Sequence, residues 1–196
     1  MSYLIVGLGN PGSEYEKTRH NVGRMMIEAL AKKNDFPDFA TEKRLKALTT
    51  TGKIGKQKVQ LLEPEPFMNN SGVSISPLIK TKKAAAELVV IHDDLDIPLG
   101  KFKISFNKSS GGHKGVESVI KAVKTSEFIR VRVGVTPALA SGKLKKPQGE
   151  AELLKFIVGE FKKPEAEIIK KLSKKVVEAL ESIVLDGREI AMGKFN

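Results

Sequence analysis

Three histidines and a short run of aspartates in this sequence could carry acid–base chemistry. The histidines are His20, His92 and His113, and residues 92–96 read His-Asp-Asp-Leu-Asp. A carboxylate that accepts a hydrogen bond from one imidazole nitrogen selects the tautomer and leaves the other nitrogen free to take a proton from water. Because the reference pKa of histidine is about 6.5, the ring is largely neutral at physiological pH and can serve as that base.

His20 and Asp93 are the pair that the expected fold can bring together. Each follows a short apolar run that is typical of a buried strand, residues 3–6 before the loop 7–21 and residues 88–91 before Asp93. Open α/β folds place their sites at the carboxyl ends of strands, so both side chains are expected on loops at one sheet edge. We therefore predict a metal-free site in which Asp93 orients His20.

Two asparagines supply uncharged amides for the same site. Asn10 lies in the loop 7–21, and Asn69 follows a second predicted strand, 58–62. An amide can polarise a carbonyl or hold the attacking water, which is the role of an oxyanion-hole donor. Taken singly, each of these residues is more often a turn or cap residue, so the hypothesis depends on their joint placement beside the histidine and aspartate.

Other kinds of site are weaker interpretations of the same residues. Gly7, Gly9 and Gly12 match the spelling of a dinucleotide-binding turn, but Pro11 removes a backbone donor and no second strand ends in an acid about 20 residues later. The run 92–96 could hold Mg or Mn, although a strand-end turn in which an aspartate orients a histidine is favoured. The sequence has no Gly-x-Ser-x-Gly elbow, which argues against a serine hydrolase of that type.

Charge and composition narrow the partners and the compartment. Lys plus Arg number 34 against 23 for Asp plus Glu, which gives a net charge of +11. That charge fits a polyanionic partner, and it fits a solvated lysine-rich surface equally well. The absence of cysteine excludes disulfides, thiolate zinc sites and a cysteine nucleophile. No apolar stretch reaches the roughly 18 residues of a membrane span, so we expect a cytoplasmic protein with no membrane partner.

The segments around these residues alternate between strand and helix patterns, which predicts a single α/β domain over residues 1–196 with a mixed sheet. Strands are expected over 3–6, 44–51, 58–62, 88–91, 101–106 and 128–135. Helices are expected from Asn21 as N-cap to about Lys33, over about 71–81, 116–123 and 150–158, and from Pro164 with Gly187 as C-cap. The last helix has its apolar stripe at Ile168, Leu172, Val176, Leu180 and Ile183.

Two further loops are expected to face the site. The turn 109–115 is rich in glycine and leads into a helix, where free backbone N–H groups suit a phosphate. Residues 137–149 are rich in Gly, Pro and Lys, which predicts a mobile basic loop that closes on substrate.

Five ordered motifs carry a resemblance to a known family. Residues 7–23 read Gly-Leu-Gly-Asn-Pro-Gly-x-x-Tyr-x-x-Thr-Arg-His-Asn-Val-Gly, and Phe67 begins the short motif Phe-Met-Asn. The run 92–96, the stretch 111–115 and the segment 156–161 complete the set. Together these motifs resemble those of bacterial-type peptidyl-tRNA hydrolases, and the similarity covers essentially the whole sequence.

The resemblance implies a three-layer α/β/α sandwich around a mixed, mostly parallel twisted sheet, in a monomer that uses no metal or other cofactor. It also implies hydrolysis of the ester that joins a peptide to the 3′ ribose of tRNA, which releases free tRNA and peptide. Matched by position, His20 would be the base and Asp93 its stabilising partner. Asn10 would help to distinguish a blocked peptidyl amide from a free amine, and Asn69 would complete the catalytic set.

The same motifs imply a set of residues that bind tRNA. Tyr15, Phe67 and Asn69 would line the channel for the acceptor end, and Lys103 and Arg132 would meet phosphate. The glycine-rich motif adds two residues to this set, His113 and Lys114.

Two positions depart from the family's pattern. Asp94 stands where glutamate is usual, and Lys114 replaces an asparagine that contacts substrate in the family. Lysine keeps a donor but loses the amide acceptor, so Lys114 either reaches a phosphate or points to solvent, and the sequence leaves both open. A non-catalytic RNA-binding relative of the same fold is the alternative function; it is disfavoured because all four catalytic candidates are present.

Overall fold

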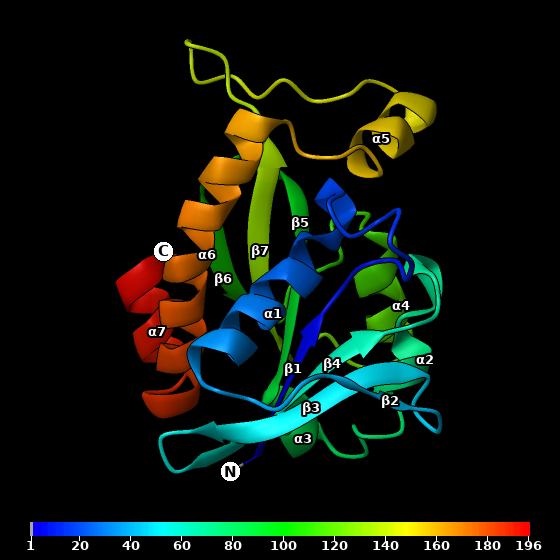
Figure 1. Cartoon of the computed structure of the whole chain (residues 1–196), viewed down its shortest axis with the longest axis vertical. Coiled ribbons are helices and arrows are strands. Elements are labelled where there is room, and N and C mark those ends of the chain that lie inside the picture. The colour runs from blue at the N-terminus through cyan, green and yellow to red at the C-terminus, as the bar shows by residue number, and fades with distance from the viewer. Residues whose placement is uncertain (1) are drawn as a thin grey trace.

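Helices cover both faces of one seven-stranded sheet, which explains why its inner strands are apolar on both sides (Figure 1). The structure is a computed structural model that describes residues 2–196. Its strands are β1 (Ser2–Gly7), β2 (Ala40–Glu42), β3 (Ala47–Ile54), β4 (Gln57–Pro64), β5 (Leu88–Pro98), β6 (Phe102–Phe106) and β7 (Ile129–Thr136). Its helices are α1 (Val22–Lys33), α2 (Gly72–Ile75), α3 (Lys82–Ala86), α4 (Lys114–Val123), α5 (Glu150–Ile157), α6 (Lys163–Leu185) and α7 (Arg188–Phe195), with the 3₁₀ helices η1 (Arg19–Asn21) and η2 (Met68–Asn70).

The strand order is β2-β3-β4-β1-β5-β7-β6. The inner strands β4, β1, β5 and β7 pair in parallel, whereas β2, β3 and β6 join antiparallel towards the edges. The predicted mixed sheet is therefore confirmed, with three of its six neighbouring pairs parallel. Because the inner strands run in one direction, the segments that follow them leave the sheet at one shared edge.

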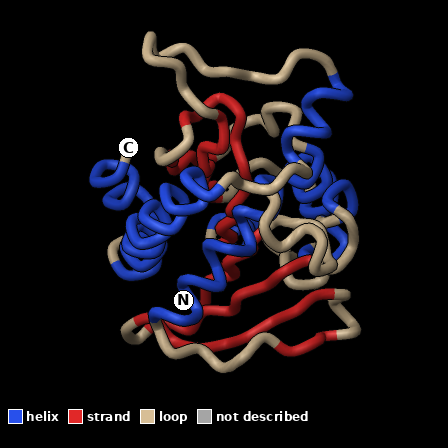
Figure 2. Tube along the Cα trace, turned by 45° about the horizontal axis from the view of Figure 1, so that its top comes forward, coloured by secondary structure: helices blue, strands red, loops and turns tan. Residues whose placement is uncertain are grey.

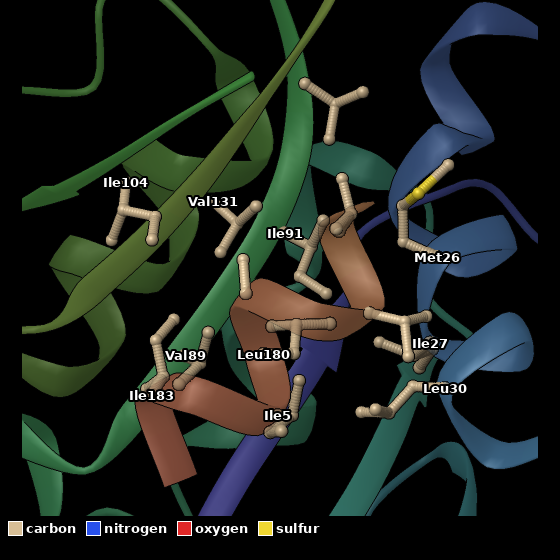
Figure 3. Packing of buried hydrophobic residues seen from close by; sticks show 14 of the residues in the cluster. Ile5, Met26, Ile27, Leu30, Val89, Ile91, Ile104, Val131, Leu180 and Ile183 are labelled. Atoms are coloured by element: carbon tan, nitrogen blue, oxygen red, sulfur yellow. The ribbon is translucent and has the colours of Figure 1, made fainter. Parts of the chain in front are cut away.

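Alternation along the inner strands divides the core into two layers. Ile5 and Ile91 belong to the layer under α1 and α6, whereas Val6 and Val90 belong to the layer under α2 and α4. Figure 3 shows the first layer, where strand side chains meet Ile27 and other residues of the two helices. Packing on both faces makes the sheet a rigid platform for whatever its edge carries.

Strand β5 is longer than the apolar run 88–91 predicted. Its ladder with β7 continues through His92, Asp93 and Asp94. Asp93 therefore lies in a strand, not in the expected loop, and its backbone is held by a neighbouring strand. The apolar run underestimated the length of β5, because its last residues are polar and are satisfied by hydrogen bonds inside the protein.

The single helix expected over about 71–81 is wrong. Helix α2 stops at Ile75, and Pro77 follows, which lacks the N–H donor that a continuing helix would need. A second helix, α3, begins after Thr81, whose hydroxyl accepts a hydrogen bond from the N–H of Ala84 at 3.1 Å. The predicted end of one helix is thus the N-cap of the next.

The C-terminal part also differs in detail from the sequence pattern. Ile168 is 41% exposed and Ile169 is 5% exposed, so the buried stripe of α6 begins one residue later than predicted. Gly187 follows the C-cap Asp186 and has a φ of 93°, a left-handed conformation that favours glycine. Helix α7 and the short edge strand β2 were not predicted, because neither has a clear apolar period.

Residues 137–149 run as irregular chain between β7 and α5, and Figure 2 shows them as a long loop that extends away from the sheet. An isolated bridge pairs Ala138 with Leu144. The predicted mobility of this loop stays a prediction. Within residues 2–196, no helix is both long enough and apolar enough to cross a membrane.

Candidate functional site

The loop between β1 and α1 is held by two asparagines. The N–H of Asn10 donates to Asn21 Oδ1 at 2.9 Å, and Asn21 Nδ2 donates back to the carbonyl of Asn10 at 2.8 Å. Asn21 precedes α1 as predicted, but its side chain does not cap that helix. The Asn21 side chain therefore positions Asn10 instead.

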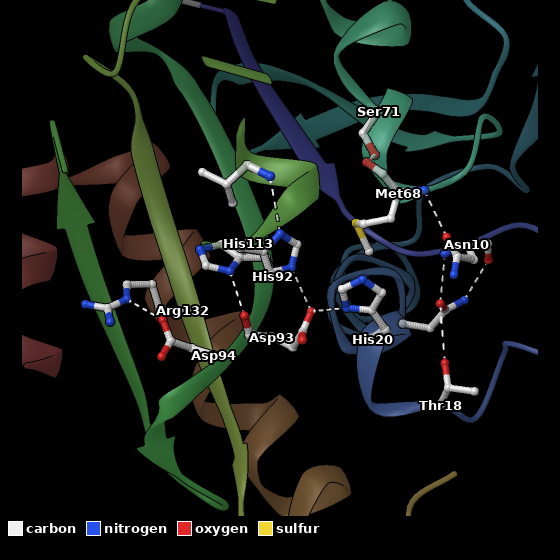
Figure 4. Close-up of polar contacts among 12 residues, drawn as sticks. Asn10, Thr18, His20, Met68, Ser71, His92, Asp93, Asp94, His113 and Arg132 are labelled. Atoms are coloured by element: carbon white, nitrogen blue, oxygen red, sulfur yellow. Dashed lines mark hydrogen bonds and ion pairs between the residues drawn. The ribbon is translucent and has the colours of Figure 1, made fainter. Parts of the chain in front are cut away.

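Asn10 presents one defined group to the site. Its Oδ1 accepts the N–H of Met68, from η2, at 2.9 Å (Figure 4). Nδ2 has no partner within residues 2–196, so Asn10 offers an amide donor whose orientation is already set. Such a donor can polarise a carbonyl oxygen.

Helix α1 starts close against the sheet because two glycines allow it. A Cβ on Gly7 would lie 2.5 Å from the carbonyl oxygen of Gly23, and a Cβ on Gly23 would lie 2.4 Å from the carbonyl oxygen of Ile91. This close approach brings η1, which carries His20, beside the end of β5.

His20 and Asp93 are in direct contact, as the sequence predicted. His20 Nδ1 lies 2.8 Å from Asp93 Oδ1, and the two residues are 7% and 3% exposed. Burial lowers the pKa of His20, but the charge and hydrogen bond of Asp93 outweigh it, and the pKa is raised above its ordinary value. With Nδ1–H donated to the carboxylate, Nε2 is left unpaired within residues 2–196 and can accept a proton.

Asp93 has a second histidine partner that the sequence did not indicate. His113 Nε2 lies 2.9 Å from the same Oδ1 atom. Burial raises the pKa of Asp93, but the two histidines together hold it well below its usual range. Asp93 is therefore ionised and accepts from both rings.

The tautomer of His113 follows from its other nitrogen. His113 is the N-cap of α4, and its Nδ1 accepts the backbone N–H of Val116 at 3.2 Å. A nitrogen that accepts cannot carry a proton, so His113 is neutral and its proton is on Nε2, facing Asp93. The helix N-terminus predicted to suit a phosphate is thus partly capped by His113 itself.

The same contact argues against a metal ion between these residues. His20, Asp93 and His113 each place one possible ligand atom within 4.8 Å of the others. A histidine that binds a metal through one nitrogen normally donates its other N–H to an acceptor. His113 does the reverse, because Nδ1 receives a backbone N–H and Nε2 must keep its proton. The chemistry of this donor set favours acid–base catalysis over metal binding.

His92 supports the backbone of Asp93. Its Nδ1 donates to the carbonyl of Asp93 at 2.7 Å, and its ring meets that of His113 edge-on at 4.7 Å between centroids. Burial, followed by the nearby His113, holds the pKa of His92 well below its ordinary value. His92 is therefore a neutral structural residue.

A cavity of about 300 Å³ opens beside His20 and Asp93. Asp94 in its wall pairs with Arg132 at 2.7 Å, and Asp96 pairs with Lys146 from the loop 137–149. Of the charged side chains that line this cavity, Lys114 alone has no ion-pair partner within residues 2–196. An anionic group in the cavity would therefore meet Lys114.

The other predicted binding residues lie on two sides of this centre. Tyr15 and Phe67 form an edge-to-face aromatic pair with centroids 6.3 Å apart, and Phe67 is 57% exposed. Asn69 is exposed in η2, one residue after the Met68 that holds Asn10, and makes no hydrogen bond with His20 or Asp93.

Lys103 and Arg132 are neighbours across the ladder of β6 and β7. They line a second cavity of about 770 Å³, which shares Asp96 with the first. Three further lysines line the same cavity: Lys101, Lys175 and Lys194. This concentration of positive charge beside the site matches a phosphate backbone.

Arg19 is a supporting residue that the sequence reasoning missed. Its guanidinium donates to the carbonyls of Phe156, Gly159 and Glu160 at 2.9–3.3 Å and pairs with Glu165 at 2.7 Å. The residue next to His20 thereby ties η1 to α5 and α6. Its position between Thr18 and His20 was the one indication in the sequence that Arg19 could matter. Its acceptors could not be predicted, because they are backbone carbonyls.

Known proteins match this chain in sequence and in fold over nearly its whole length. A family model described as peptidyl-tRNA hydrolase matches residues 4–196. A peptidyl-tRNA hydrolase of Thermoanaerobacter sp. is 40% identical over 195 residues, with 99% of each sequence covered, and one of Aquifex aeolicus is 39% identical, with 96% of this chain and 93% of that protein covered. The crystal structure of peptidyl-tRNA hydrolase from Acinetobacter baumannii has a TM-score of 0.88 at 29% identity, covering 99% of this chain and 94% of that one. This chain therefore belongs to the peptidyl-tRNA hydrolase family.

Proposed function

We propose that this protein hydrolyses the ester between the peptide and the 3′ ribose of peptidyl-tRNA and releases free tRNA and peptide. The observation that carries the proposal is the buried His20–Asp93 contact, which leaves His20 Nε2 without a partner within residues 2–196 at the edge of a cavity, where the unprotonated ring can take a proton. Family membership supports the substrate class.

In the proposed reaction, His20 Nε2 takes a proton from water while the water oxygen bonds to the ester carbonyl carbon. The tetrahedral intermediate then expels the 3′ oxygen of the ribose, which receives the proton from the His20 imidazolium. Asp93 stabilises that imidazolium through Nδ1. No metal takes part in these steps.

The amides and the basic residues have separate proposed roles. Asn10 Nδ2 donates to a carbonyl of the peptide. An aminoacyl-tRNA with a free amine has no acyl carbonyl on its nitrogen, so it would lack this contact. Asn69 would hold the water or the substrate from η2, and the Tyr15–Phe67 pair would stack beside the acceptor end. Lys103 and the N–H groups of Arg132 left over from Asp94 would meet phosphate.

We also propose that the protein works as a monomer in the cytoplasm, where tRNA is its partner. Gel filtration with light scattering would give one copy if this is correct, whereas a stable dimer would contradict it.

The function is tested by incubating the purified protein with N-acetyl-aminoacyl-tRNA in excess chelator. We expect release of free tRNA at a rate that the chelator does not change, and little release from unblocked aminoacyl-tRNA. Binding without cleavage would favour the alternative, a non-catalytic RNA-binding relative. Cleavage that stops on adding chelator would contradict the metal-free mechanism.

A further inference from the structure

We propose that His113 is a positioning residue that holds the Asp93 carboxylate for His20 and makes no hydrogen bond of its own to the substrate. Its motif had placed His113 among the residues that bind tRNA. The inference rests on the proposed function, because it assigns a role within that reaction.

Both polar atoms of the His113 ring are already in use. Nδ1 accepts the N–H of Val116 at 3.2 Å, and Nε2 donates to Asp93 Oδ1 at 2.9 Å. The side chain is only 9% exposed. A substrate atom could bond to this ring only by displacing one of these two partners, which would uncap α4 or release the carboxylate.

The geometry also explains why Asp93 has two histidine partners. Its Oδ1 accepts from His20 at 2.8 Å and from His113 at 2.9 Å, and the two ring centroids are 5.1 Å apart. A carboxylate with a single partner could follow His20 as that ring turns. A second donor from α4, on another element, keeps the oxygen in place.

Sharing the carboxylate has an electrostatic consequence for the base. Asp93 raises the pKa of His20, and a second donor on the same oxygen withdraws part of the negative charge that does so. His113 thereby helps to keep His20 unprotonated near neutral pH.

The other titratable and charged groups near His20, Asp93 and His113 do not take a share of the Asp93 charge as His113 does. His92 on β5 is neutral, and Arg130 on β7 acts on His92. The charged residues that line the adjoining cavity are Asp94 and Asp96, each with a basic partner, together with Lys114 and Lys146.

The test compares two amide replacements with the wild type. His113→Asn keeps an acceptor for the Val116 N–H, because asparagine is a good N-cap, but it is too short to reach Asp93. His113→Gln places an amide donor near the position of Nε2. The pair therefore separates the Asp93 contact from the cap and from the fold.

We expect His113→Asn to lower kcat by about 10–100-fold with little change in KM. The acidic limb of kcat/KM should move to higher pH, because His20 then has Asp93 to itself. His113→Gln should recover most of kcat and return the limb towards the wild-type position. A defect of folding alone would lower the amount of active enzyme without moving that limb.

Two results would overturn the inference. One is a raised KM with an unchanged kcat in His113→Asn, which is the signature of a lost substrate contact. The other is a wild-type kcat and pH profile in that variant. If that variant does not fold, His113→Ser gives the same readouts, because serine also caps the helix and is too short to reach Asp93. The proposed function fails separately, since in that case the wild type would not cleave the substrate.

Discussion

The Oδ1 atom of Asp93 accepts hydrogen bonds from His20 and His113, and this shared acceptance determines where both histidines carry their protons. His113 is locked by the N–H of Val116, so the rings are not equivalent. Of these two rings, that of His20 has the nitrogen, Nε2, that is unpaired within residues 2–196 and can exchange a proton with the cavity. One backbone donor, the N–H of Val116, therefore distinguishes the base His20 from the supporting His113.

Lys114 is the residue for which the structure sharpens an open question. It is exposed in the cavity wall and has no ion-pair partner within residues 2–196, whereas the aspartates beside it are paired. The favoured interpretation is a phosphate contact, because an unpaired lysine in a cavity with neutralised carboxylates attracts an anion.

Lys114→Asn tests that interpretation through the salt dependence of tRNA binding. Each phosphate contact removed should reduce the slope of log K against log salt by about 0.7–0.9. The matched control is Lys121→Asn, which changes an exposed lysine of α4 outside the cavity and should leave the slope unchanged. Equal slopes for wild type and Lys114→Asn would show that Lys114 points to solvent.

Among the elements, β5 and the loop 7–21 were the easiest to place from sequence. Parallel inner strands share a carboxyl edge, so an apolar run followed by polar residues could be placed at that edge. The shared edge predicted that His20 and Asp93 could meet, and the structure shows them in contact. The contact of Asn10 with Met68 of η2 was not predicted. Placing His20 and Asp93 at the shared edge required only the direction of the strands and no knowledge of contacts between distant side chains.

Other contacts could not be predicted, for physical reasons. His113 is the second partner of Asp93 because of how α4 packs. The backbone N–H of Val116 that fixes its tautomer cannot be recognised in a sequence, since nearly every residue has such a group. Arg19 donates to backbone carbonyls, which every residue has and which a sequence therefore cannot single out. Ile168 and Ile169 are adjacent and equally apolar, so only the packing of α6 decides which one is buried. The helix predicted over 71–81 was wrong because Pro77 lies inside that range and cannot continue a helix.

Arg19 gives a prediction at the scale of elements, because it joins η1 to α5 and α6. Its side chain is 7% exposed and that of Glu165 is 14% exposed. Arg19→Ala would remove the ion-pair partner of Glu165 and one donor from each of three carbonyls, and should lower the free energy of unfolding by about 2–4 kcal/mol. Urea denaturation measures the change.

Arg44→Ala is the control for this measurement, because Arg44 is exposed and should change the free energy of unfolding by no more than about 0.5 kcal/mol. A similar small effect for Arg19→Ala would mean that the link between η1 and α5 does not stabilise the fold.

For the whole molecule, charge is distributed unevenly. The net charge is +11, and basic residues line the larger cavity beside the site. Glu63 in β4 is buried, its Oε1 has no hydrogen-bond partner within residues 2–196, and its Oε2 lies 3.7 Å from Arg24 Nη1. Burial, only partly offset by Arg24, raises the pKa of Glu63 to about 7.

This raised pKa predicts how stability depends on pH. Between about pH 4.5 and 7 the folded state binds a proton at Glu63 that the unfolded state has released, so this group lowers stability as pH rises through that range. Glu63→Gln should raise the free energy of unfolding by about 1–3 kcal/mol at pH 8 and by less than about 1 kcal/mol at pH 5.

The control for that prediction is Glu167→Gln, which changes an exposed side chain and should have no such pH dependence. If Glu63→Gln had the same effect at both pH values, Glu63 would titrate normally and the argument from burial would be wrong.

The proposed mechanism depends on His20, oriented by Asp93, as the base that activates water. The most direct test is kcat for N-acetyl-aminoacyl-tRNA, measured at saturating substrate in excess chelator for the wild type and His20→Ala. We expect His20→Ala to lose about 10²–10⁴-fold in kcat, the contribution typical of a general base, while tRNA binding and the unfolding curve stay close to the wild type. A kcat near the wild-type value in His20→Ala would contradict the assignment of His20 as the base.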